Sequence, residues 1–159
     1  MMAKFCLSIC LLVFSNMGFA EQQTWYLVRH FEKQLAADPS LTETGKARAQ
    51  ALAEFFADKP LQRIFSTNYK RTMQTADPVA AQKALPIQSY DPNELAGFAE
   101  LVSHLNHVLV VGHSNTTPEL LSLLGGAKIT MSELDYGTVY VLHKENGVFQ
   151  THTQTIHLP

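Results

Sequence analysis

The feature that most constrains this chain is the alternation of short β-type runs with helical patterns. Three apolar runs rich in β-branched and aromatic residues lie at 24–28, 61–65 and 107–111. The first lacks a strict polar–apolar alternation, which is typical of a strand covered on both faces. Helical spacing of apolar residues fills the intervals between these runs, which indicates a parallel sheet packed between helices.

The first two predicted helices have recognisable boundaries. The pattern LTETGKARAQALAEFF can begin at Thr42 or Thr44 as N-cap and ends before Pro60. The next helix is predicted from Lys70 onward, and Pro78 is expected to kink or interrupt it because proline lacks the N–H that a helix needs. Residues 85–97, with two prolines and a glycine, are expected to form a loop, and 95–105 a further helix.

The C-terminal third contains one more predicted helix, followed by two strands with alternating polar and apolar residues. A helix is predicted with Thr117 as N-cap and Pro118 as its first residue, ending at Gly125 or Gly126. Residues 138–143 and 148–155 then alternate around Glu145-Asn146-Gly147, which is a hairpin signal. The predicted fold is therefore a three-layer α/β/α sandwich with a mostly parallel central sheet and a C-terminal β-hairpin.

Residues 1–20 are typical of a signal peptide. Lys4 is followed by an apolar stretch and by the small-x-small site Gly18-Phe19-Ala20. We expect an exported protein, periplasmic or secreted, whose single domain spans 21–159, although retention of the segment as an anchor is an alternative. The chain's 2 cysteines, Cys6 and Cys10, lie in this segment. The mature domain would therefore have no disulfide, thiol nucleophile or thiolate metal site.

Composition excludes several classes of protein. The chain has 159 residues, of which 46% are hydrophobic and 16% charged, as expected of one globular domain and not of a disordered chain. The formal net charge of −2 gives no indication of nucleic-acid binding or of attraction to an anionic membrane. Any positively charged site must be local.

Cationic side chains follow three of the predicted strands. Arg29 and His30 come directly after the first, Arg71 follows the second, and His113 follows the third. Ligands of open α/β sheets bind beyond the carboxyl ends of the strands. We therefore expect these four side chains to converge on one anion-binding site.

These residues lie in the motifs RHFEK, STNYKRTMQTA and VVGHSN, and LTETG begins the first helix. In this order the motifs resemble the histidine phosphatase superfamily, the phosphoglycerate mutase-like proteins. The resemblance extends from about Thr24 to Leu124. It is greater to the small single-domain members, such as phosphohistidine phosphatases and exported phosphatases, than to the mutases.

The resemblance implies a role for each residue of the predicted site. His30 would be the nucleophile and would form a phosphohistidine intermediate. Arg29, Arg71 and His113 would bind the phosphoryl group, with the guanidinium groups matching phosphate oxygens. Catalysis would be electrostatic and positional, without a metal or another cofactor.

The resemblance also implies a general acid for the leaving group, in the loop before the third strand. Glu94, in DPNEL, is the candidate, and Asp91 and Glu100 are alternatives that the sequence leaves open.

The chain departs from the family pattern at several positions. Phe31 follows the predicted nucleophile where glycine is common, and its side chain must either turn away from the phosphate or line the substrate entrance. Thr72 stands where alanine is usual. The asparagine of true mutases has no evident counterpart in QLAADPS, which argues against a mutase.

The expected function is hydrolysis of phosphomonoesters or phosphoramidates through His30. The partner would be a small phosphorylated substrate, whose identity the sequence leaves open, as it does the oligomeric state. The alternative is a phosphate- or partner-binding module of the same fold with little turnover. A metal hydrolase would need a further ligand near His30 and His113, and no spacing of ligands indicates one.

Overall fold

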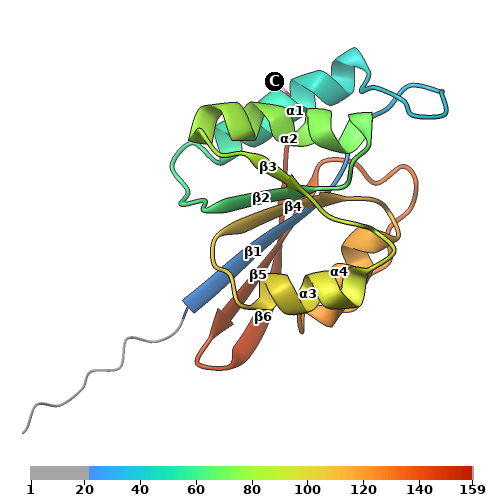
Figure 1. The fold of residues 1–159 in the computed structure, drawn as a ribbon. Helices are drawn as coiled ribbons and strands as arrows, with labels where there is room; N and C mark the ends of the chain where they lie inside the picture. The colour runs from blue at the N-terminus through green and yellow to red at the C-terminus, as the bar shows by residue number, and fades with distance from the viewer. Residues whose placement is uncertain (1–21, 159) are drawn as a thin grey trace, which may run out of the picture.

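The computed structural model describes residues 22–158, which form one six-stranded sheet and four helices (Figure 1). The predicted signal peptide lies outside the described residues. In chain order the elements are β1 (Gln22–Arg29), α1 (Glu43–Phe55), β2 (Arg63–Ser66), α2 (Lys70–Lys83), β3 (Ile87–Ser89), α3 (Leu95–Ser103), β4 (Val108–Gly112), α4 (Thr116–Leu123), β5 (Thr138–Glu145) and β6 (Val148–Thr155).

The strands follow the order β3-β2-β4-β1-β5-β6. β1 pairs in parallel with β4 and antiparallel with β5, while β2 is parallel to both β3 and β4. β5 and β6 form the predicted hairpin, in which Asn146 and Gly147 have positive φ angles of 51° and 79°. The carboxyl ends of β1, β2 and β4 therefore meet at one edge of the sheet.

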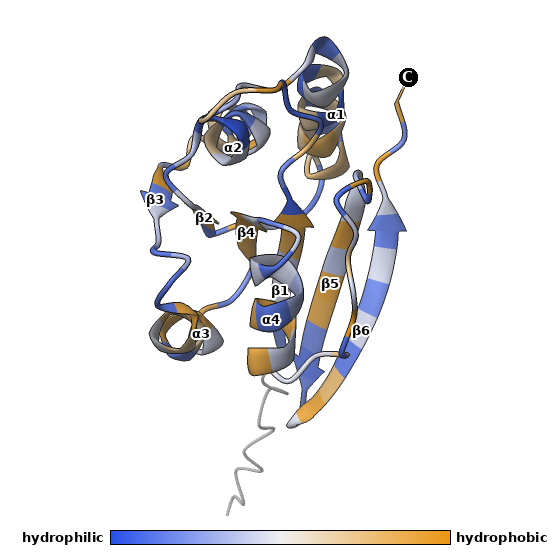
Figure 2. Cartoon of the chain, turned by 90° about the vertical axis from the view of Figure 1, so that its right-hand side faces the viewer, coloured by the Kyte–Doolittle hydropathy of each residue, from blue (hydrophilic) through white to orange (hydrophobic). Residues whose placement is uncertain are grey.

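Two helices cover each face of this sheet (Figure 2). A hydrophobic core lies on each face of the sheet, and alternate residues of β1 point into one or the other. Tyr26 and Val28 pack with residues of α1 and α2, whereas Trp25 and Leu27 pack with residues of α3 and α4. The observed continuous apolar run is what a strand buried on both faces requires. The predicted three-layer α/β/α sandwich is confirmed.

Several element boundaries differ from the prediction. α2 runs through Pro78 without a break, because Ala76 and Val79 are fully buried and their packing outweighs the loss of one backbone hydrogen bond. α4 begins at Thr116, two residues before Pro118. The predicted loop contains β3, a three-residue strand at the edge of the sheet. Thr42 is the N-cap of α1, and its Oγ1 accepts a hydrogen bond from Gly45 N at 3.1 Å.

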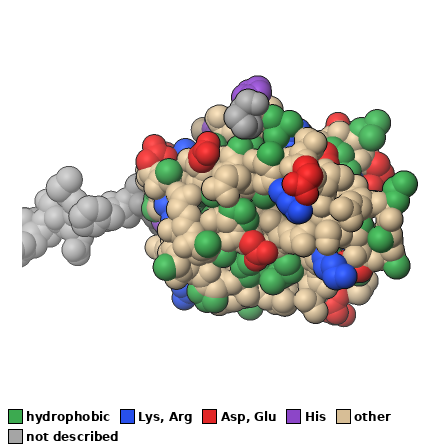
Figure 3. Space-filling model, turned by 90° about the horizontal axis from the view of Figure 1, so that it is seen from above, with side chains coloured by type: hydrophobic (Ala, Val, Ile, Leu, Met, Phe, Trp, Pro, Cys, Tyr) green, Lys and Arg blue, Asp and Glu red, His purple; other side chains and the backbone are tan. Residues whose placement is uncertain are grey.

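Residues 22–158 contain no helix of the length and apolarity that a bilayer crossing requires. Seen from above, acidic and basic side chains are intermixed with hydrophobic ones across the surface (Figure 3). The surface on this side thus agrees with the modest net charge of the chain.

Candidate active site

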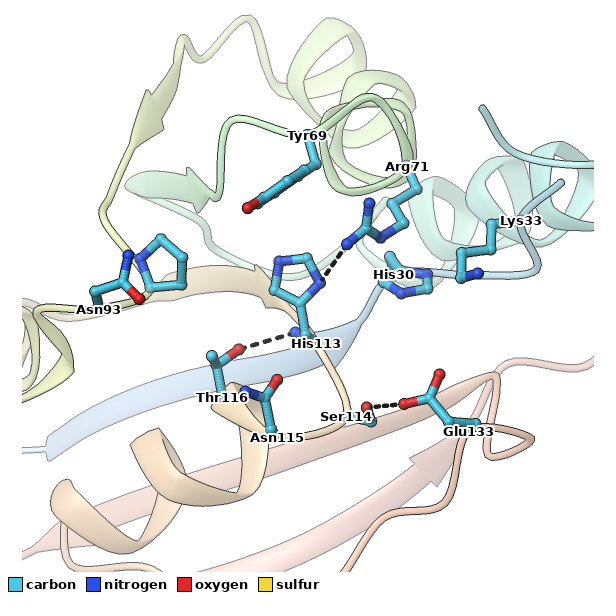
Figure 4. A pocket seen from close by; sticks show the side chains of 11 residues that line it. His30, Lys33, Tyr69, Arg71, Asn93, His113, Ser114, Asn115, Thr116 and Glu133 are labelled. Atoms are coloured by element: carbon cyan, nitrogen blue, oxygen red, sulfur yellow. Dashed lines mark hydrogen bonds between the residues drawn. The ribbon is translucent and has the colours of Figure 1, made fainter. Parts of the chain in front are cut away.

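A cavity of about 340 Å³ lies at the carboxyl ends of β1, β2 and β4 (Figure 4). Its lining is mostly polar and cationic, and comes from every segment that follows these strands. The lining residues are His30, Lys33, Tyr69, Arg71, Pro92, Asn93, His113, Ser114, Asn115, Thr116 and Glu133. Three of the predicted site residues, His30, Arg71 and His113, are therefore brought together.

His30 is 3% exposed and is fixed by two hydrogen bonds. Its backbone N donates to Gly112 O at 2.9 Å, which joins the ends of β1 and β4. Its Nδ1 lies 2.8 Å from Phe31 O. A carbonyl oxygen can only accept, so Nδ1 carries the hydrogen, and Nε2 of the neutral ring keeps its lone pair.

The surroundings of His30 keep this imidazole neutral. Burial lowers the pKa of His30 to about 3, and the charges of Arg29 and Arg71 act in the same direction, while the hydrogen bond to Phe31 opposes them. At neutral pH the ring is therefore an unprotonated base with an available nitrogen. That is the state a nucleophile requires.

His113 lies beside His30, with 5.6 Å between the ring centroids. Arg71 Nη2 approaches His113 Nδ1 at 3.3 Å, and Tyr69 stacks edge-on against the imidazole (Figure 4). Burial and then the charges of Arg71 and Arg29 lower the pKa of His113 to about 4, against an opposing effect of Glu133. His113 is thus also neutral in the free protein.

Arg29 is 2% exposed and is not among the residues that line the cavity. Its guanidinium group faces the segment before β5, where Nη1 donates to Ser132 O at 2.9 Å and Nη2 contacts Glu133 Oε2 at 3.0 Å. The Tyr136 ring lies 4.4 Å from the guanidinium carbon. The predicted contact between Arg29 and a phosphate therefore requires rearrangement of these partners.

Glu133 is a site residue that the sequence reasoning missed. Its carboxylate lines the cavity and accepts hydrogen bonds from the Ser114 hydroxyl and from Arg29, although the side chain is 73% exposed. The Ser114 hydrogen bond, followed by the charge of Arg29, lowers the pKa of Glu133 against the effect of burial. A single glutamate in an irregular segment carries no local signal, and its contacts reach residues far away in the sequence.

None of the three predicted acids is among the lining residues of this cavity. Glu94 is exposed at the N-terminus of α3, next to Asn93, which does line the cavity. Asp91 accepts hydrogen bonds from Asn93, and Glu100 Oε1 lies 3.2 Å from His104 Nε2 on α3. The assignment of Glu94 as general acid therefore stays a prediction.

Phe31 is fully buried in the core formed with α1 and α2. Of the two placements expected for this bulky side chain, the structure has the one directed away from the site. The backbone still contributes, since Phe31 N donates to Thr75 Oγ1 at 3.1 Å and Phe31 O orients His30. Its side chain cannot select the substrate by direct contact.

Among residues 22–158, no three His, Cys, Asp or Glu side chains are grouped so that they could hold a metal ion.

Comparison with known proteins agrees with this geometry. The family model of the histidine phosphatase superfamily (branch 1) matches residues 25–92, which include Arg29, His30 and Arg71. Residues 25–92 of this chain are therefore similar to the histidine phosphatase superfamily. The search of curated proteins finds no match.

Solved structures of phosphatases and of a phosphoglycerate mutase share the fold over nearly their whole length. A protein assigned as phosphohistidine phosphatase SixA from Nakamurella multipartitia is 21% identical, with a TM-score of 0.63, and the match covers 86% of this chain and 98% of that one. The protein histidine phosphatase SixA complexed with tungstate is 16% identical, with a TM-score of 0.67 and coverage of 84% and 97%. A phosphoglycerate mutase from Bacillus anthracis is 17% identical, with a TM-score of 0.65 and coverage of 85% and 93%. At these identities the likeness concerns the fold.

Proposed function

We propose that this protein is a metal-independent phosphatase that hydrolyses phosphomonoesters or phosphoramidates through a phosphohistidine on His30. The observation that carries the proposal is the state of His30. It is buried and neutral, has Nε2 free, and lies with Arg71 and His113 around one cavity.

The reaction follows from these groups. Nε2 of His30 attacks phosphorus, and the bond to the leaving oxygen or nitrogen breaks with its electron pair. Arg71 stabilises the charge on the phosphoryl oxygens, as guanidinium groups do in phosphoryl transfer. Water then attacks the phosphohistidine, which releases phosphate and restores the neutral imidazole.

The carboxyl groups near the cavity determine whether the protein can protonate the leaving group. Glu133 is the carboxyl group that lines the cavity, and its lowered pKa keeps it ionised at neutral pH, so it is not a ready proton donor. Glu94 is adjacent to the rim but exposed. This arrangement favours substrates whose leaving group needs no proton from a carboxylic acid of the protein: aryl phosphates, which leave as phenolates, and phosphoramidates, whose more basic nitrogen takes its proton from solvent before it leaves. The neighbours named phosphohistidine phosphatase, one of them in complex with tungstate, are in keeping with that choice.

One observation favours the alternative function, a binding module with little turnover. The carboxylate of Glu133 is ion-paired with Arg29, a residue predicted to bind the phosphoryl group. A protein that keeps this pair in the presence of substrate would bind anions through Arg71 and Lys33 and turn over poorly. Export, to which residues 1–20 point, would place either activity outside the cytoplasm.

The test is hydrolysis of p-nitrophenyl phosphate and of phosphohistidine by the wild-type protein, with and without EDTA. We expect activity that survives EDTA, is lost in His30→Ala, and is retained in His104→Ala, a control at an exposed histidine of α3. An acid-labile phosphoenzyme should be trapped in the wild type and in His104→Ala, and not in His30→Ala. Wild-type inactivity with tight phosphate binding would select the binding module, and equal turnover by His30→Ala would remove the nucleophile.

A further inference from the structure

Two buried threonines lie behind His113. Thr67, after β2, and Thr72, in the first turn of α2, are both fully buried. We propose that Thr72 is a positioning residue that orients the hydroxyl of Thr67 and thereby keeps the proton of His113 on Nε2 and its lone pair on Nδ1. The proposal rests on the proposed function only in so far as His113 acts on a phosphoryl group.

The hydroxyl of Thr72 determines the direction of the hydrogen bonds. Thr72 Oγ1 lies 2.8 Å from Thr67 O and 2.9 Å from Tyr69 O, and both carbonyl oxygens can only accept. The single hydrogen of Thr72 is therefore used there. Thr67 Oγ1, 2.9 Å away, must donate its own hydrogen to Thr72. What Thr67 then presents to His113 Nε2, also at 2.9 Å, is a lone pair.

The opposite side of the imidazole leads to the same tautomer. Arg71 Nη2 lies 3.3 Å from His113 Nδ1, and a guanidinium group has no acceptor. Nδ1 must therefore be the accepting nitrogen and Nε2 the donating one. The hydrogen bond from Arg71 and the hydrogen bonds of Thr72 involve different atoms, and both predict a hydrogen on Nε2 of His113.

This tautomer matters when an anion binds. A phosphoryl oxygen that approaches Nδ1 meets a lone pair, so His113 has to gain a proton at Nδ1 before it can donate to the phosphate. Thr67 accepts from Nε2–H in the neutral ring and in the protonated ring alike, so protonation leaves that bond intact. If Thr67 were turned to donate, the hydrogen would move to Nδ1 and point at the Arg71 guanidinium group.

Several charged and titratable groups face His113. They are Arg29 at the end of β1, His30 directly after it, Tyr69 and Arg71 at the start of α2, and Glu133 from the segment before β5. Among the described residues, Arg71 and Thr67 are the side chains that hydrogen-bond to the ring nitrogens of His113. The surrounding charges affect how readily the ring is protonated, whereas the hydrogen bonds of Thr67 and Arg71 together determine which nitrogen of the neutral ring carries the proton.

The direct test is nitrogen NMR of the imidazole rings at pH 7 in the wild type, Thr72→Val and Thr72→Ser. Valine preserves the shape of threonine without its hydroxyl, and serine restores the hydroxyl. We expect the Nε2–H pattern for His113 in the wild type and in Thr72→Ser, and a mixture of tautomers in Thr72→Val. An unchanged pattern in Thr72→Val, or an Nδ1–H ring in the wild type, would overturn the proposal.

Kinetics give a second readout. Loss of one buried hydrogen bond predicts a fall of about three- to tenfold in kcat/KM for p-nitrophenyl phosphate in Thr72→Val, recovered in Thr72→Ser. Thr24→Val is the matched control, because Thr24 Oγ1 lies 3.0 Å from His143 Nδ1 at the other end of β1. That variant removes the same kind of pair and should leave both kcat/KM and the His113 signals unchanged.

The two proposals fail separately. If the His113 tautomer changes as expected but the wild type hydrolyses nothing, the phosphatase proposal is wrong and the role of Thr72 stands. If His30-dependent hydrolysis occurs and the tautomer of Thr72→Val equals that of the wild type, the role of Thr72 is wrong. A Thr67→Val variant covers the case in which Thr72→Val does not fold, since it removes the acceptor itself and should also release the Nε2–H preference.

Discussion

At the scale of single residues, His30 and His113 differ in how their tautomers are held. His30 is oriented by a backbone carbonyl of its own neighbour, Phe31, and so by local chain geometry. His113 is oriented by side chains from α2 and from the turn that precedes it. The tautomer of His30, the proposed nucleophile, is thus less sensitive than that of His113 to substitutions elsewhere in the site.

The two lowered pKa values predict a loss of stability in acid. In the unfolded chain a histidine binds its proton below about pH 6.5, whereas in the folded protein the pKa is about 4 for His113 and about 3 for His30. Between these limits the unfolded state binds more protons, so the free energy of unfolding falls as the pH falls from 6.5 towards 3. Urea unfolding at pH 7 and pH 5 should show a smaller loss in His30→Asn than in the wild type.

The control for this prediction is His104→Asn, which alters an exposed histidine and should keep the wild-type dependence on pH. An equal loss of stability in His30→Asn and in the wild type would mean that the burial of His30 does not suppress its protonation.

Glu133 is expected to compete with anionic ligands for Arg29. Glu133→Gln removes the negative charge and keeps the shape of the side chain, so inorganic phosphate should inhibit at a lower concentration. Exposed ion pairs contribute up to about 1 kcal/mol, which corresponds to up to about a fivefold change in the inhibition constant. Glu100→Gln, on the exposed side of α3, is the control. Weaker inhibition by phosphate in Glu133→Gln would show instead that the carboxylate supports binding.

The residues that the sequence identifies are those that follow strands directly. His30, Arg71 and His113 could be predicted because each lies within a few residues of a strand's carboxyl end, and the sheet brings those ends together. The surroundings of Arg29 could not be predicted, since Ser132, which accepts its hydrogen bond, is 103 residues away in the chain. Glu133 was missed for the same reason.

At the scale of elements, the loop between β1 and α1 is fixed by Glu32. Its carbonyl oxygen accepts from Thr42 N at 2.8 Å, and its carboxylate binds Arg48 of α1. Arg48 Nη1 in turn donates to Ile156 O at 2.7 Å, after β6. The loop that carries His30 is therefore tied both to α1 and to the C-terminal end of the described chain.

Gly45 allows this close contact between α1 and the loop. A Cβ atom at this position would collide with the backbone carbonyl of Glu32, and backbone cannot move aside as a flexible side chain can. Gly45→Ala should therefore lower the free energy of unfolding by about 1–3 kcal/mol, as overpacking does. Gly97→Ala, on α3, is the matched control, because a Cβ atom there would meet nothing within 4 Å. That substitution should stabilise slightly, by up to about 1 kcal/mol. Thermal unfolding of both variants measures the difference.

The elements that could be predicted are those with a clear hydrophobic periodicity, a continuous apolar run or a characteristic turn sequence. β4, buried throughout, and the hairpin around Asn146-Gly147 are examples. β3 could not be predicted, because three residues at a sheet edge show too little pattern and owe their conformation to pairing with β2. α2 continued through Pro78 because tertiary packing overrode a local preference.

At the scale of the whole molecule, the net charge of the chain is negative, whereas basic side chains gather at the cavity. The chain carries a formal net charge of −2, while Lys33 and Arg71 line the cavity and Arg29 lies beside it. Substrate attraction is therefore local, within about the 8–10 Å screening length of physiological salt.

Because of this charge distribution, KM for an anionic aryl phosphate should rise with potassium chloride concentration. Lys33→Gln should raise KM at low salt and weaken its dependence on salt. Lys46→Gln changes an exposed lysine that pairs with Glu43 on α1, and it should behave as the wild type does. A salt dependence that is the same in all three proteins would place the attraction elsewhere than at Lys33.

The position of β1 between β4 and β5 has a consequence for how the protein reaches its native state. β1 is the first strand of the chain, yet Thr24 bonds to Asn106 and His143, which are 82 and 119 residues further on. Such long-range pairing is slow to form, because a large loop must close and lose conformational entropy before stabilising contacts can form. During synthesis β1 has no parallel neighbour until β4 has emerged, and no antiparallel neighbour until β5 follows. The candidate active site is therefore completed late, and a chain stopped before β5 would expose an apolar strand that is prone to aggregation.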